Sequence, residues 1–507
     1  MISGENIICG RARAGKGSDI VQGKDPTTNT MIGPGFRVAS ADDVEEAVQG
    51  AWEAFLLYRK YSDVDRAGLL DAIAGEIEGL GDEVIQCAMA ETGLPEMRLR
   101  GELQRTAFQF RLFKKVLLEG RYQDIRIDAA LPERKPLPRP DIRSRKISLG
   151  PVAVFGASNF PFAFSVAGGD TASALAAGCP VIVKAHPAHP HTSALMGIAL
   201  VSAIEKVGMP PGIFSLLYGV DNSLGQTLVT DHRIKAVGFT GSRSGGVALM
   251  HAAASRPEPI PVYAEMSSIN PVYLMPGALF SNSSGIAEGL VNAMMLGAGQ
   301  FCTSPGVVLA VQGNAFNGFI EKAKTLLSGQ SAQTMLTSGI ANAFDESIVQ
   351  ISKCAQVVGA GKPKTGTNQC HAHLFYTSAD DFMNNEILRK EIFGSSVIFV
   401  GCRDFSQMTA VTESFEGQLT ASIHATDNDS TTELEVLIDQ LERKAGRILM
   451  NGFGTGVEVC DAIVHGGPYP ATSDGRSTSV GSASIERFLR PVCYQNIPST
   501  LLPAVLR

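Results

Sequence analysis

The sequence lacks the features that would mark a membrane, secreted or nucleic-acid-binding protein. No apolar run in its 507 residues reaches the length of about 20 residues that a membrane-spanning helix needs. The first residues include no long apolar segment, so we expect no signal peptide. The formal net charge of −7 provides no excess of basic side chains to neutralise phosphates. We therefore expect neither a membrane nor a nucleic acid as partner.

Paired cysteines and metal-ligand spacings are missing as well. The nine cysteines are an odd number without a Cys-x-x-Cys pair, which argues against a disulfide framework and predicts reduced thiols in the cytoplasm. The histidine-rich segment at residues 186–191 is followed by no carboxylate or cysteine at ligand spacing, and the segment at residues 371–373 offers two imidazoles alone. We interpret these histidines as structural and predict no metal site.

The length of the chain indicates two or three domains, because one compact core does not grow to this size. Residues 1–39 predict edge strands and turns, and four helices follow between Ser40, the expected first N-cap, and Gly120. Residues 121–149 alternate polar and apolar side chains around a proline-rich connection. They predict a two-stranded ribbon that has little of its own to bury and packs on another domain or subunit.

Apolar strands alternate with helices between residues 150 and 262. Four strands are expected at residues 150–157, 179–185, 213–219 and 234–241, with helices at residues 161–177 and 192–207. This alternation predicts a doubly wound parallel sheet, in which ligands bind at the carboxyl ends of the strands. Asn159 and Lys184 follow two of these strands, and Gly241, Ser242 and Gly246 bracket a helix start that suits a phosphate. The Gly-x-Gly-x-x-Gly fingerprint is absent from these turns.

Two further residues stand out in the next α/β region, residues 263–450. Glu265 lies in the strand-like segment PVYAEM, where we expect burial to raise its pKa toward neutrality and make it a usable base. The alternative is a capped or ion-paired core glutamate. Cys302 lies in GAGQFCTSPG, after an apolar helical run, and small residues there would let a substrate approach a nucleophile closely. The alternative is an inert thiol, one among nine.

Six segments now appear in the order typical of one enzyme family and span nearly the whole chain: SNFPF, VIVKA, FTGS with Gly246, AEMSSINP, GQFC and EIFG. The sequence thereby resembles the NAD(P)-dependent aldehyde dehydrogenase superfamily. The resemblance implies an α/β fold with a Rossmann-like cofactor domain (residues 1–120 and 150–262) and an α/β catalytic domain (263–450). It also implies a small β oligomerisation ribbon and tail (121–149 and 485–507) and a tunnel segment (451–484).

The resemblance also implies the chemistry. Cys302 would attack the aldehyde carbon to give a thiohemiacetal and then a thioester, Asn159 would hold the oxyanion, and Glu265 would activate water. The implied cofactor contacts are Ser158, Lys184, His186, Gly241, Ser242, Gly246, Glu391 and Phe393. The implied tunnel residues are Phe160, Phe301 and Phe453, for which generic core aromatics are the alternative. Subunit contacts through the ribbon and tail would give a homodimer or a homotetramer.

Departures from the family pattern narrow the subfamily. Ser267 and Ser268 stand where the family has Gly-Gly, Ser158 where many members have Trp, and Ser395 where a Pro is usual. The segment VHGGPYPATSD (residues 464–474) replaces the late FGGxKxSG segment. These features are similar to the α-ketoglutaric semialdehyde (2,5-dioxopentanoate) dehydrogenase branch, which implies oxidation of that aldehyde to 2-oxoglutarate. A long-chain branch shares some of them, so a medium- or long-chain aliphatic aldehyde is the alternative substrate.

The residues that follow the predicted cofactor lysine bear on the cofactor preference. Pro187 stands where NAD-preferring relatives carry a Glu, and Lys184 and His186 would attract a 2′-phosphate. We therefore expect NADP as the preferred cofactor, with NAD also accepted. A catalytically silent binding protein is disfavoured because all three catalytic residues are intact. An acylating enzyme that uses coenzyme A is disfavoured because Glu265 points to water as acceptor.

Overall fold

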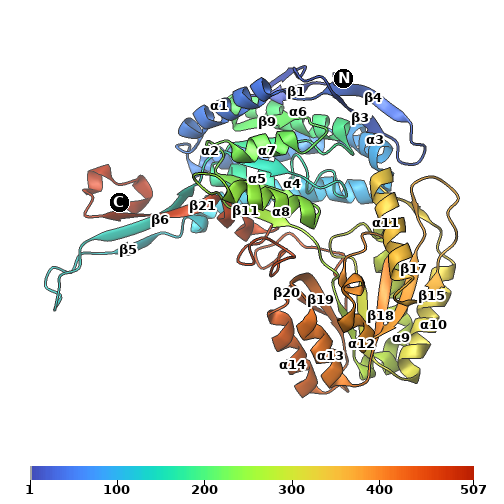
Figure 1. Cartoon of the computed structure of the whole chain (residues 1–507). Helices are drawn as coiled ribbons and strands as arrows, with labels where there is room; N and C mark the ends of the chain where they lie inside the picture. Colours follow the sequence, from blue (N-terminus) through green and yellow to red (C-terminus); the bar gives the residue numbers. More distant parts are fainter. Residues whose placement is uncertain (1–2) are drawn as a thin grey trace.

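The computed structural model describes residues 3–507, which form two α/β bodies and a projecting ribbon (Figure 1). The sheet of the first body includes the strands between residues 150 and 265, and the sheet of the second body lies within residues 272–450. Both sheets consist mainly of parallel strands. The predicted α/β class, with a separate small β ribbon, is thereby confirmed.

The first sheet has the order β11-β10-β7-β8-β9-β1-β2, and only its edge pairings through β1 are antiparallel. Its strands are β1 (Asn6–Ile8), β2 (Arg11–Arg13), β7 (Val152–Phe155), β8 (Val181–Lys184), β9 (Phe214–Leu217), β10 (Ala236–Thr240) and β11 (Val262–Glu265). All four residues of β7 are buried, as expected for a parallel strand covered on both faces. Because β11 runs to Glu265, the first sheet ends later than the boundary expected at residue 262.

Helices surround this sheet: α1 (Ala41–Tyr58), α2 (Asp63–Gly79), α3 (Gly81–Thr92), α4 (Glu96–Glu119), α5 (Gly169–Ala177), α6 (Pro190–Lys206), α7 (Ser223–Thr230) and α8 (Arg243–Ala254). Ser40 caps α1 as predicted, in a reciprocal capping box with Asp43. Helix α5 begins later than the expected residue 161. The residues before it form turns, where the N–H groups of Phe162 and Ala163 donate to the Glu102 carboxylate instead of continuing a helix.

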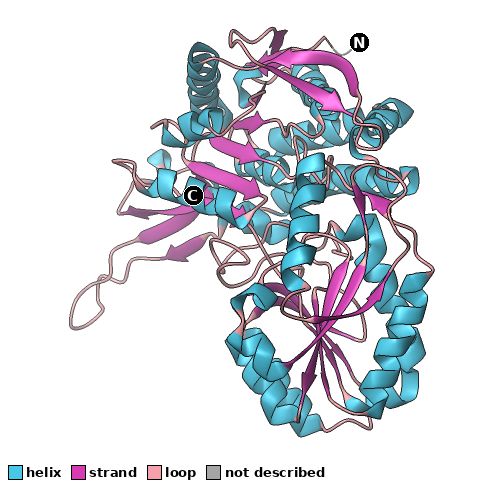
Figure 2. Cartoon of the chain, turned by 45° about the vertical axis from the view of Figure 1, so that its right-hand side comes forward, coloured by secondary structure: helices cyan, strands magenta, loops and turns pink. Residues whose placement is uncertain are grey.

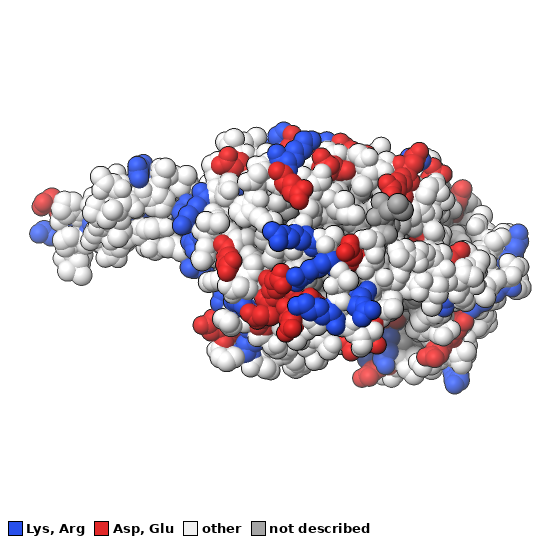
Figure 3. All heavy atoms as spheres, turned by 90° about the horizontal axis from the view of Figure 1, so that it is seen from above, with Lys and Arg blue, Asp and Glu red and all other residues white. Residues whose placement is uncertain are grey.

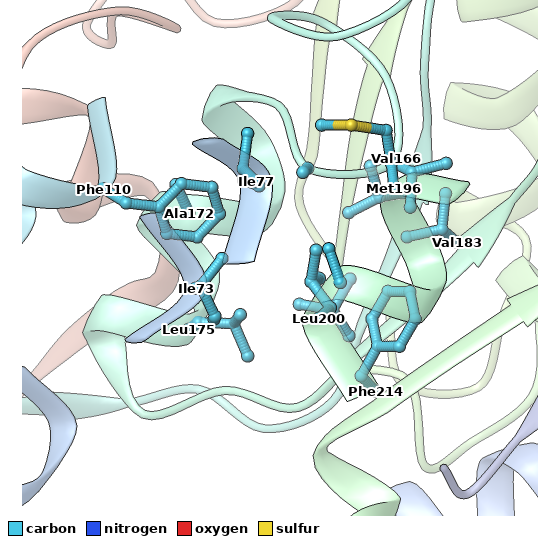
Figure 4. Close-up of a cluster of buried hydrophobic side chains, with 14 of the residues drawn as sticks. Ile73, Ile77, Phe110, Val166, Ala172, Leu175, Val183, Met196, Leu200 and Phe214 are labelled. Carbon is cyan, nitrogen blue, oxygen red and sulfur yellow. The ribbon is translucent and has the colours of Figure 1, made fainter. Parts of the chain in front are cut away.

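The core of the first body lies where helices α2, α4, α5 and α6 meet the sheet. Figure 4 shows side chains of this core, all fully buried or nearly so: Ile73, Ile77, Phe110, Val166, Ala172, Leu175, Val183, Met196, Leu200 and Phe214. Burying such side chains stabilises the fold by about 1.5–3 kcal/mol each. This packing fixes the carboxyl ends of β7 and β8, from which Asn159 and Lys184 follow.

The second sheet has the order β15-β17-β18-β13-β12-β19-β20, with helices on both of its faces (Figure 2). Its strands are β12 (Val272–Leu274), β13 (Val307–Val311), β15 (Gln356–Ala360), β17 (His373–Ser378), β18 (Ser396–Cys402), β19 (Gln418–His424) and β20 (Ala445–Met450). Its helices are α9 (Pro276–Met295), α10 (Asn314–Ser328), α11 (Ser338–Ile351), α12 (Ala379–Asn384), α13 (Phe405–Ser414) and α14 (Thr431–Glu442). Only β15 runs antiparallel to its neighbour. Two short pairs, β3 (Ile20–Lys24) with β4 (Met31–Arg37) and β14 (Gln333–Thr334) with β16 (Gln369–Cys370), complete the two bodies.

The ribbon is a three-stranded antiparallel sheet of β5 (Arg126–Asp128), β6 (Ile142–Ser148) and the C-terminal β21 (Leu489–Gln495). It projects from the first body (Figure 1). The sequence thus predicted its first two strands, and the tail adds the third. Arg487 attaches this tail to the first body, since its Nη1 lies 2.7 Å from Asp170 Oδ1 and both side chains are largely buried.

The surface seen from above carries Lys, Arg, Asp and Glu side chains of both signs close together (Figure 3). Exposed ion pairs connect neighbouring helices of the protein, such as Arg111 with Glu78. Exposed pairs of this kind contribute little to stability, roughly 0–1 kcal/mol each. Within residues 3–507, no helix combines the length and the apolar character needed to cross a membrane.

Candidate active site

A cavity of about 500 Å³ lies between the two bodies. Its walls include Arg243 at the start of α8, the segment Ser267–Ile269 after β11, and Glu391 and Gln418 of the second body. Among the predicted site residues, Glu391 lines this cavity, Phe301 and Phe393 line a small adjoining one, and Glu265 and Cys302 come into contact with each other. The sheet topology explains the gathering, because β11 and the loop after α9 bring Glu265 and Cys302 together from positions that are far apart in the sequence.

The Cys302 loop follows α9 through a tight turn, as the sequence predicted. Gly297, Ala298 and Gly299 all have left-handed backbone conformations, with φ of 58°, 58° and 71°. A Cβ on Gly299 would lie 2.3 Å from the carbonyl carbon of Gly394, and one on Gly297 would meet Arg98 and a phenyl ring. The expectation that these glycines open a path for substrate is therefore wrong. They allow a sharp turn and a close approach to neighbouring protein atoms.

A histidine that the sequence did not predict joins the two main catalytic candidates. Nε2 of His465 lies 3.6 Å from Cys302 Sγ and 3.0 Å from Glu265 Oε1. The Ser479 hydroxyl donates to the other carboxylate oxygen of Glu265 at 3.0 Å. His465 belongs to the segment 464–474, which replaces the usual family motif. That departure was the signal that could have drawn attention to it.

The pKa of Glu265 differs from the sequence expectation. Burial raises it, but the charge and hydrogen bond of His465, together with contacts from Cys302 and Ser479, outweigh burial and lower the pKa. The prediction of a pKa near neutrality is therefore wrong, because the sequence did not reveal these partners. Burial and the charge of Glu265 raise the pKa of the Cys302 thiol well above its usual value. The resting pair is thus a thiol beside a carboxylate.

Glu265, Cys302 and His465 also present three donor atoms within 4.8 Å of one another. Thiolate, imidazole and carboxylate are the ligand types that Zn²⁺ takes in proteins. Here each of the three groups contacts another member of the cluster, which suits proton transfer between them. The absence of a metal at this site stays a prediction.

Asparagine side chains hold the nucleophile loop from two sides. The buried Asn159 donates from Nδ2 to the carbonyl of Gln300 at 2.9 Å, so its amide lies beside the Cys302 loop. Asn270 donates to the carbonyls of Cys302 and Ser304 at 2.9 and 2.8 Å. Asn270 has a φ of 46°, a left-handed conformation that Asn tolerates. The sequence showed it only as part of SSINP and did not indicate this role.

The predicted cofactor residues Lys184 and His186 follow strand β8. Burial lowers the pKa of Lys184, while the nearby Asp221 carboxylate raises it. Burial, with His189 and Lys184 nearby, lowers the pKa of His186 well below its usual value. A neutral His186 offers no positive charge to a 2′-phosphate, so this part of the sequence argument for NADP is wrong. The argument had also not considered Asp221.

The turn from Gly241 to Gly246 forms the N-terminus of α8, as predicted. Ser242 is the N-cap, and its hydroxyl accepts from the Gly245 N–H at 3.2 Å. Gly241 and Ser242 are exposed at this helix end, where backbone N–H groups and the helix dipole favour an anion. A Cβ on Gly246 would lie 2.7 Å from Met266 Sδ, so its packing against β11 calls for glycine.

Glu391 is part of the cavity wall that the second body provides. Burial and the charge of Glu265 raise the pKa of Glu391 to about 8, while Ser267 and the Ser268 N–H oppose this rise. The serines that depart from the family pattern therefore contact a predicted cofactor residue. Phe393 lines a small adjoining cavity together with Glu391. Ser158, the remaining predicted contact, is half-buried in the loop after β7.

Two of the three predicted tunnel residues meet each other. The rings of Phe160 and Phe301 form an edge-to-face contact with centroids 5.1 Å apart, and the Arg98 guanidinium lies over both. Phe164, which the sequence did not predict, lies 5.3 Å from Phe160. Phe453 packs elsewhere, with its ring centroid 4.8 Å from that of His424.

Comparisons with known proteins identify the family of this chain. A model of the Aldehyde dehydrogenase family matches residues 13–490. "Alpha-ketoglutaric semialdehyde dehydrogenase 2" from Azospirillum brasilense is 50% identical over 509 residues, covering 100% of this chain and 97% of that protein. "Alpha-ketoglutaric semialdehyde dehydrogenase" from Acinetobacter baylyi is 44% identical over 511 residues, covering 100% and 96%.

Solved structures show a similar fold at lower sequence identity. A mutant of aldehyde dehydrogenase C from Pseudomonas syringae, complexed with NAD⁺ and octanal, has a TM-score of 0.82 at 19% identity and covers 97% of this chain and 96% of that one. A 1-pyrroline-5-carboxylate dehydrogenase from Thermus with bound NAD has a TM-score of 0.84 at 21% identity, covering 97% and 92%.

Proposed function

The chain belongs to the aldehyde dehydrogenase family, and we propose that it oxidises α-ketoglutaric semialdehyde to 2-oxoglutarate with NAD(P)⁺. Its class is that of an NAD(P)-dependent aldehyde dehydrogenase. The observation that carries the substrate proposal is the likeness to two α-ketoglutaric semialdehyde dehydrogenases over the full length of this chain. The cluster of Cys302, Glu265 and His465 supports the chemistry, because it joins a nucleophile to proton acceptors.

The residues around the cavity fit a nicotinamide dinucleotide. The α8 N-terminus at Ser242 suits a pyrophosphate, and Gly241 and Gly246 beside it pack closely against Phe239 and Met266. Lys184, which has no ion pair within residues 3–507, suits the hydroxyl groups of a ribose, and Glu391 suits those of the nicotinamide ribose. When bound, the nicotinamide supplies the hydride acceptor of the oxidation.

The first half of the reaction makes a covalent bond to the enzyme. The Cys302 thiol gives its proton to the Glu265–His465 pair, and the thiolate attacks the aldehyde carbon. The carbonyl oxygen becomes an oxyanion, to which the Asn159 amide donates a hydrogen bond. The thiohemiacetal then loses a hydride and becomes a thioester on Cys302.

The second half releases the product. The Glu265–His465 pair first releases the proton of Cys302 to solvent. Glu265, a carboxylate held by His465 and Ser479, then accepts a proton from a water molecule, which attacks the thioester carbon. The carbon–sulfur bond breaks, the acid leaves, and Cys302 is regenerated. Each turnover consumes one aldehyde, one NAD(P)⁺ and one water, and it yields one carboxylate, one NAD(P)H and two protons.

For the finer cofactor choice, we propose NADP over NAD. Among the described residues, no carboxylate lies within 4.0 Å of the Lys184 ammonium group. Asp221 acts on it from farther away, and because Asp221 is exposed, solvent and salt screen its charge. Comparing kcat/KM for the two cofactors tests this choice. A strong preference for NAD would overturn it.

We also propose a homodimer or homotetramer assembled through the ribbon and the tail. The ribbon exposes Ile127 and Leu137, large apolar side chains that a partner would cover. The mass of the particle in solution, measured by light scattering, tests the assembly. A monomeric mass would contradict it.

One assay tests the enzymatic proposal. We expect purified protein with NADP and α-ketoglutaric semialdehyde to produce reduced cofactor without coenzyme A, and Cys302→Ala to abolish the product. Activity only with aliphatic aldehydes would refute the substrate. An active Cys302→Ala variant would refute the mechanism, and no activity across a broad aldehyde panel would indicate a silent binding protein.

A further inference from the structure

Arg105 lies on helix α4 and lines a narrow cavity beside the active site. The other walls of this cavity include Ala163 and Phe164, which follow the Asn159 segment, and the apolar Val459 and Val480. Val459 and Val480 come from the tunnel segment expected between residues 451 and 484. A cationic side chain therefore faces an otherwise largely apolar space close to the reacting groups.

The guanidinium of Arg105 has no fixed partner. Its Cζ lies 5.3 Å from the ring centroid of Phe164, an interaction that leaves its N–H donors free. No hydrogen bond or ion pair of Arg105 occurs within residues 3–507. An arginine has five N–H donors. A half-buried guanidinium whose donors have no partner is therefore available to bind an anion.

The carboxylates nearest to Arg105 do not form ion pairs with its guanidinium. Glu102, on the same helix, is already held by two backbone N–H groups, and Glu458 is an exposed loop residue. Neither carboxylate lies within ion-pair distance. Burial lowers the pKa of Arg105, and the nearby acidic groups, including Cys302 and Glu265, partly oppose this shift. Arg105 is therefore close enough to Cys302 and Glu265 for its charge to act on them.

The two other arginines near the tunnel are occupied by protein atoms. Arg98 donates to the Asn159 carbonyl and lies against two phenyl rings. Arg447 donates to the carbonyls of Gly454 and Gly456. Arg98 Nε and Nη1 and Arg447 Nε are buried without a partner, but both side chains are tied to backbone carbonyls. Of the three, Arg105 alone makes no hydrogen bond to a protein atom among the described residues.

Phe164 connects Arg105 to the nucleophile. Its ring lies under the guanidinium on one side and 5.7 Å from the His465 ring on the other, and His465 contacts Cys302. A carboxylate bound at Arg105 would thus lie one layer of side chains away from the sulfur. In α-ketoglutaric semialdehyde, three carbons separate the aldehyde carbon from the carboxylate carbon, so one molecule has both groups to present.

We propose that Arg105 binds the distal carboxylate of the substrate and thereby selects acidic aldehydes over neutral ones; this rests on the proposed function. A guanidinium holds a carboxylate through two parallel N–H···O bonds, which fixes its orientation as well as its charge. The apolar walls around Arg105 strengthen this pair by excluding water. The aldehyde end is then directed toward Cys302.

The test compares Arg105→Gln with the parent enzyme on three aldehydes: α-ketoglutaric semialdehyde, succinic semialdehyde and pentanal. We expect the ratio of kcat/KM for each acidic aldehyde over that for pentanal to fall about 10- to 100-fold, the loss typical of a charged hydrogen-bonded pair. Arg105→Lys should restore part of the ratio, because it keeps the charge without the planar fork. Arg111→Gln is the matched control, on the exposed face of the same helix where Arg111 pairs with Glu78.

The outcomes separate the inference from the proposed function. If the parent enzyme prefers acidic aldehydes and Arg105→Gln keeps that preference, the inference is overturned while the function stands. An equal loss on all three aldehydes would also overturn it, because it would show a general structural defect. If the parent enzyme prefers pentanal, both proposals fail. Activity of Arg105→Gln on pentanal shows that the variant is folded.

Discussion

Replacing His465 with Gln tests the proton-transfer role of the cluster. The amide of Gln can donate to the Glu265 carboxylate, but it carries no charge to hold that carboxylate ionised and ready to accept the proton of the Cys302 thiol. A positioned general base contributes about 100- to 10,000-fold to a rate. Glu265 contacts Cys302 and remains an acceptor as far as it stays ionised. We therefore expect kcat/KM to fall by about 100-fold, at the lower end of that range.

The same substitution should move the acid limb of the pH profile. In the parent enzyme the charge of His465 opposes burial and keeps the pKa of Glu265 low. Without that charge, burial meets less opposition, so the pKa of Glu265 rises. Glu265 accepts protons only when ionised, and activity on the acid side is therefore lost at a higher pH. The midpoint of the acid limb should shift upward.

Two measurements check this prediction. The pH dependence of kcat/KM, followed by reduced-cofactor absorbance, reports the acid limb. Alkylation of Cys302 by iodoacetamide in the absence of aldehyde reports thiol deprotonation alone. Ser479→Ala is the control, because Ser479 contacts Glu265 but forms no hydrogen bond with Cys302. It should shift the acid limb in the same direction and slow alkylation much less than His465→Gln. An unchanged alkylation rate and pH profile in His465→Gln would refute the reasoning.

Three further predictions concern the loop, the cavity and the cluster. Gly299→Ala should lower the melting temperature, because the left-handed backbone costs about 1–2 kcal/mol and the new Cβ meets the Gly394 backbone; an unchanged melting temperature would contradict this. Glu391 has a folded-state pKa of about 8, above its unfolded value, so stability should fall as pH rises from about 4.5 to 8. Glu391→Gln should flatten that fall in thermal melts, and a parallel curve would argue against it. Dialysis against EDTA should leave kcat unchanged, since Glu265 and His465 bind each other, whereas a loss restored by Zn²⁺ would reveal a metal site.

The elements that the sequence predicted well are those with a local pattern. Parallel strands such as β7 and β8 appear as apolar runs bounded by turns, and Ser40 appears as a helix cap with an acidic residue three positions later. Cys302 and Glu265 lie in short segments with a family-specific order. Each of these signals is complete within about ten residues of sequence.

What the sequence could not predict depends on contacts between distant segments. His465 reaches Cys302 across 163 positions, and the sign of the Glu265 pKa shift follows from that contact. The role of Gly299 depends on Gly394, whose backbone fills the space where a side chain would lie. Helix α5 begins late because a carboxylate from another helix binds the preceding N–H groups. Periodicity has no information about such partners.

Three of the departures from the family pattern, Ser267, Ser268 and the segment 464–474, are connected in the structure. Ser267, in place of a glycine, contacts Glu391, while the Ser268 hydroxyl donates to Gln418 and fixes the turn that leads to Asn270. Glu265 links this cavity wall to His465 of the replaced segment, because its charge acts on Glu391 and its carboxylate contacts the imidazole. Changing one of these positions back to the common family residue therefore alters the environment of a carboxylate on the far side of the site. This coupling explains why the serine pair and the His-Gly-Gly segment belong to the same active-site arrangement.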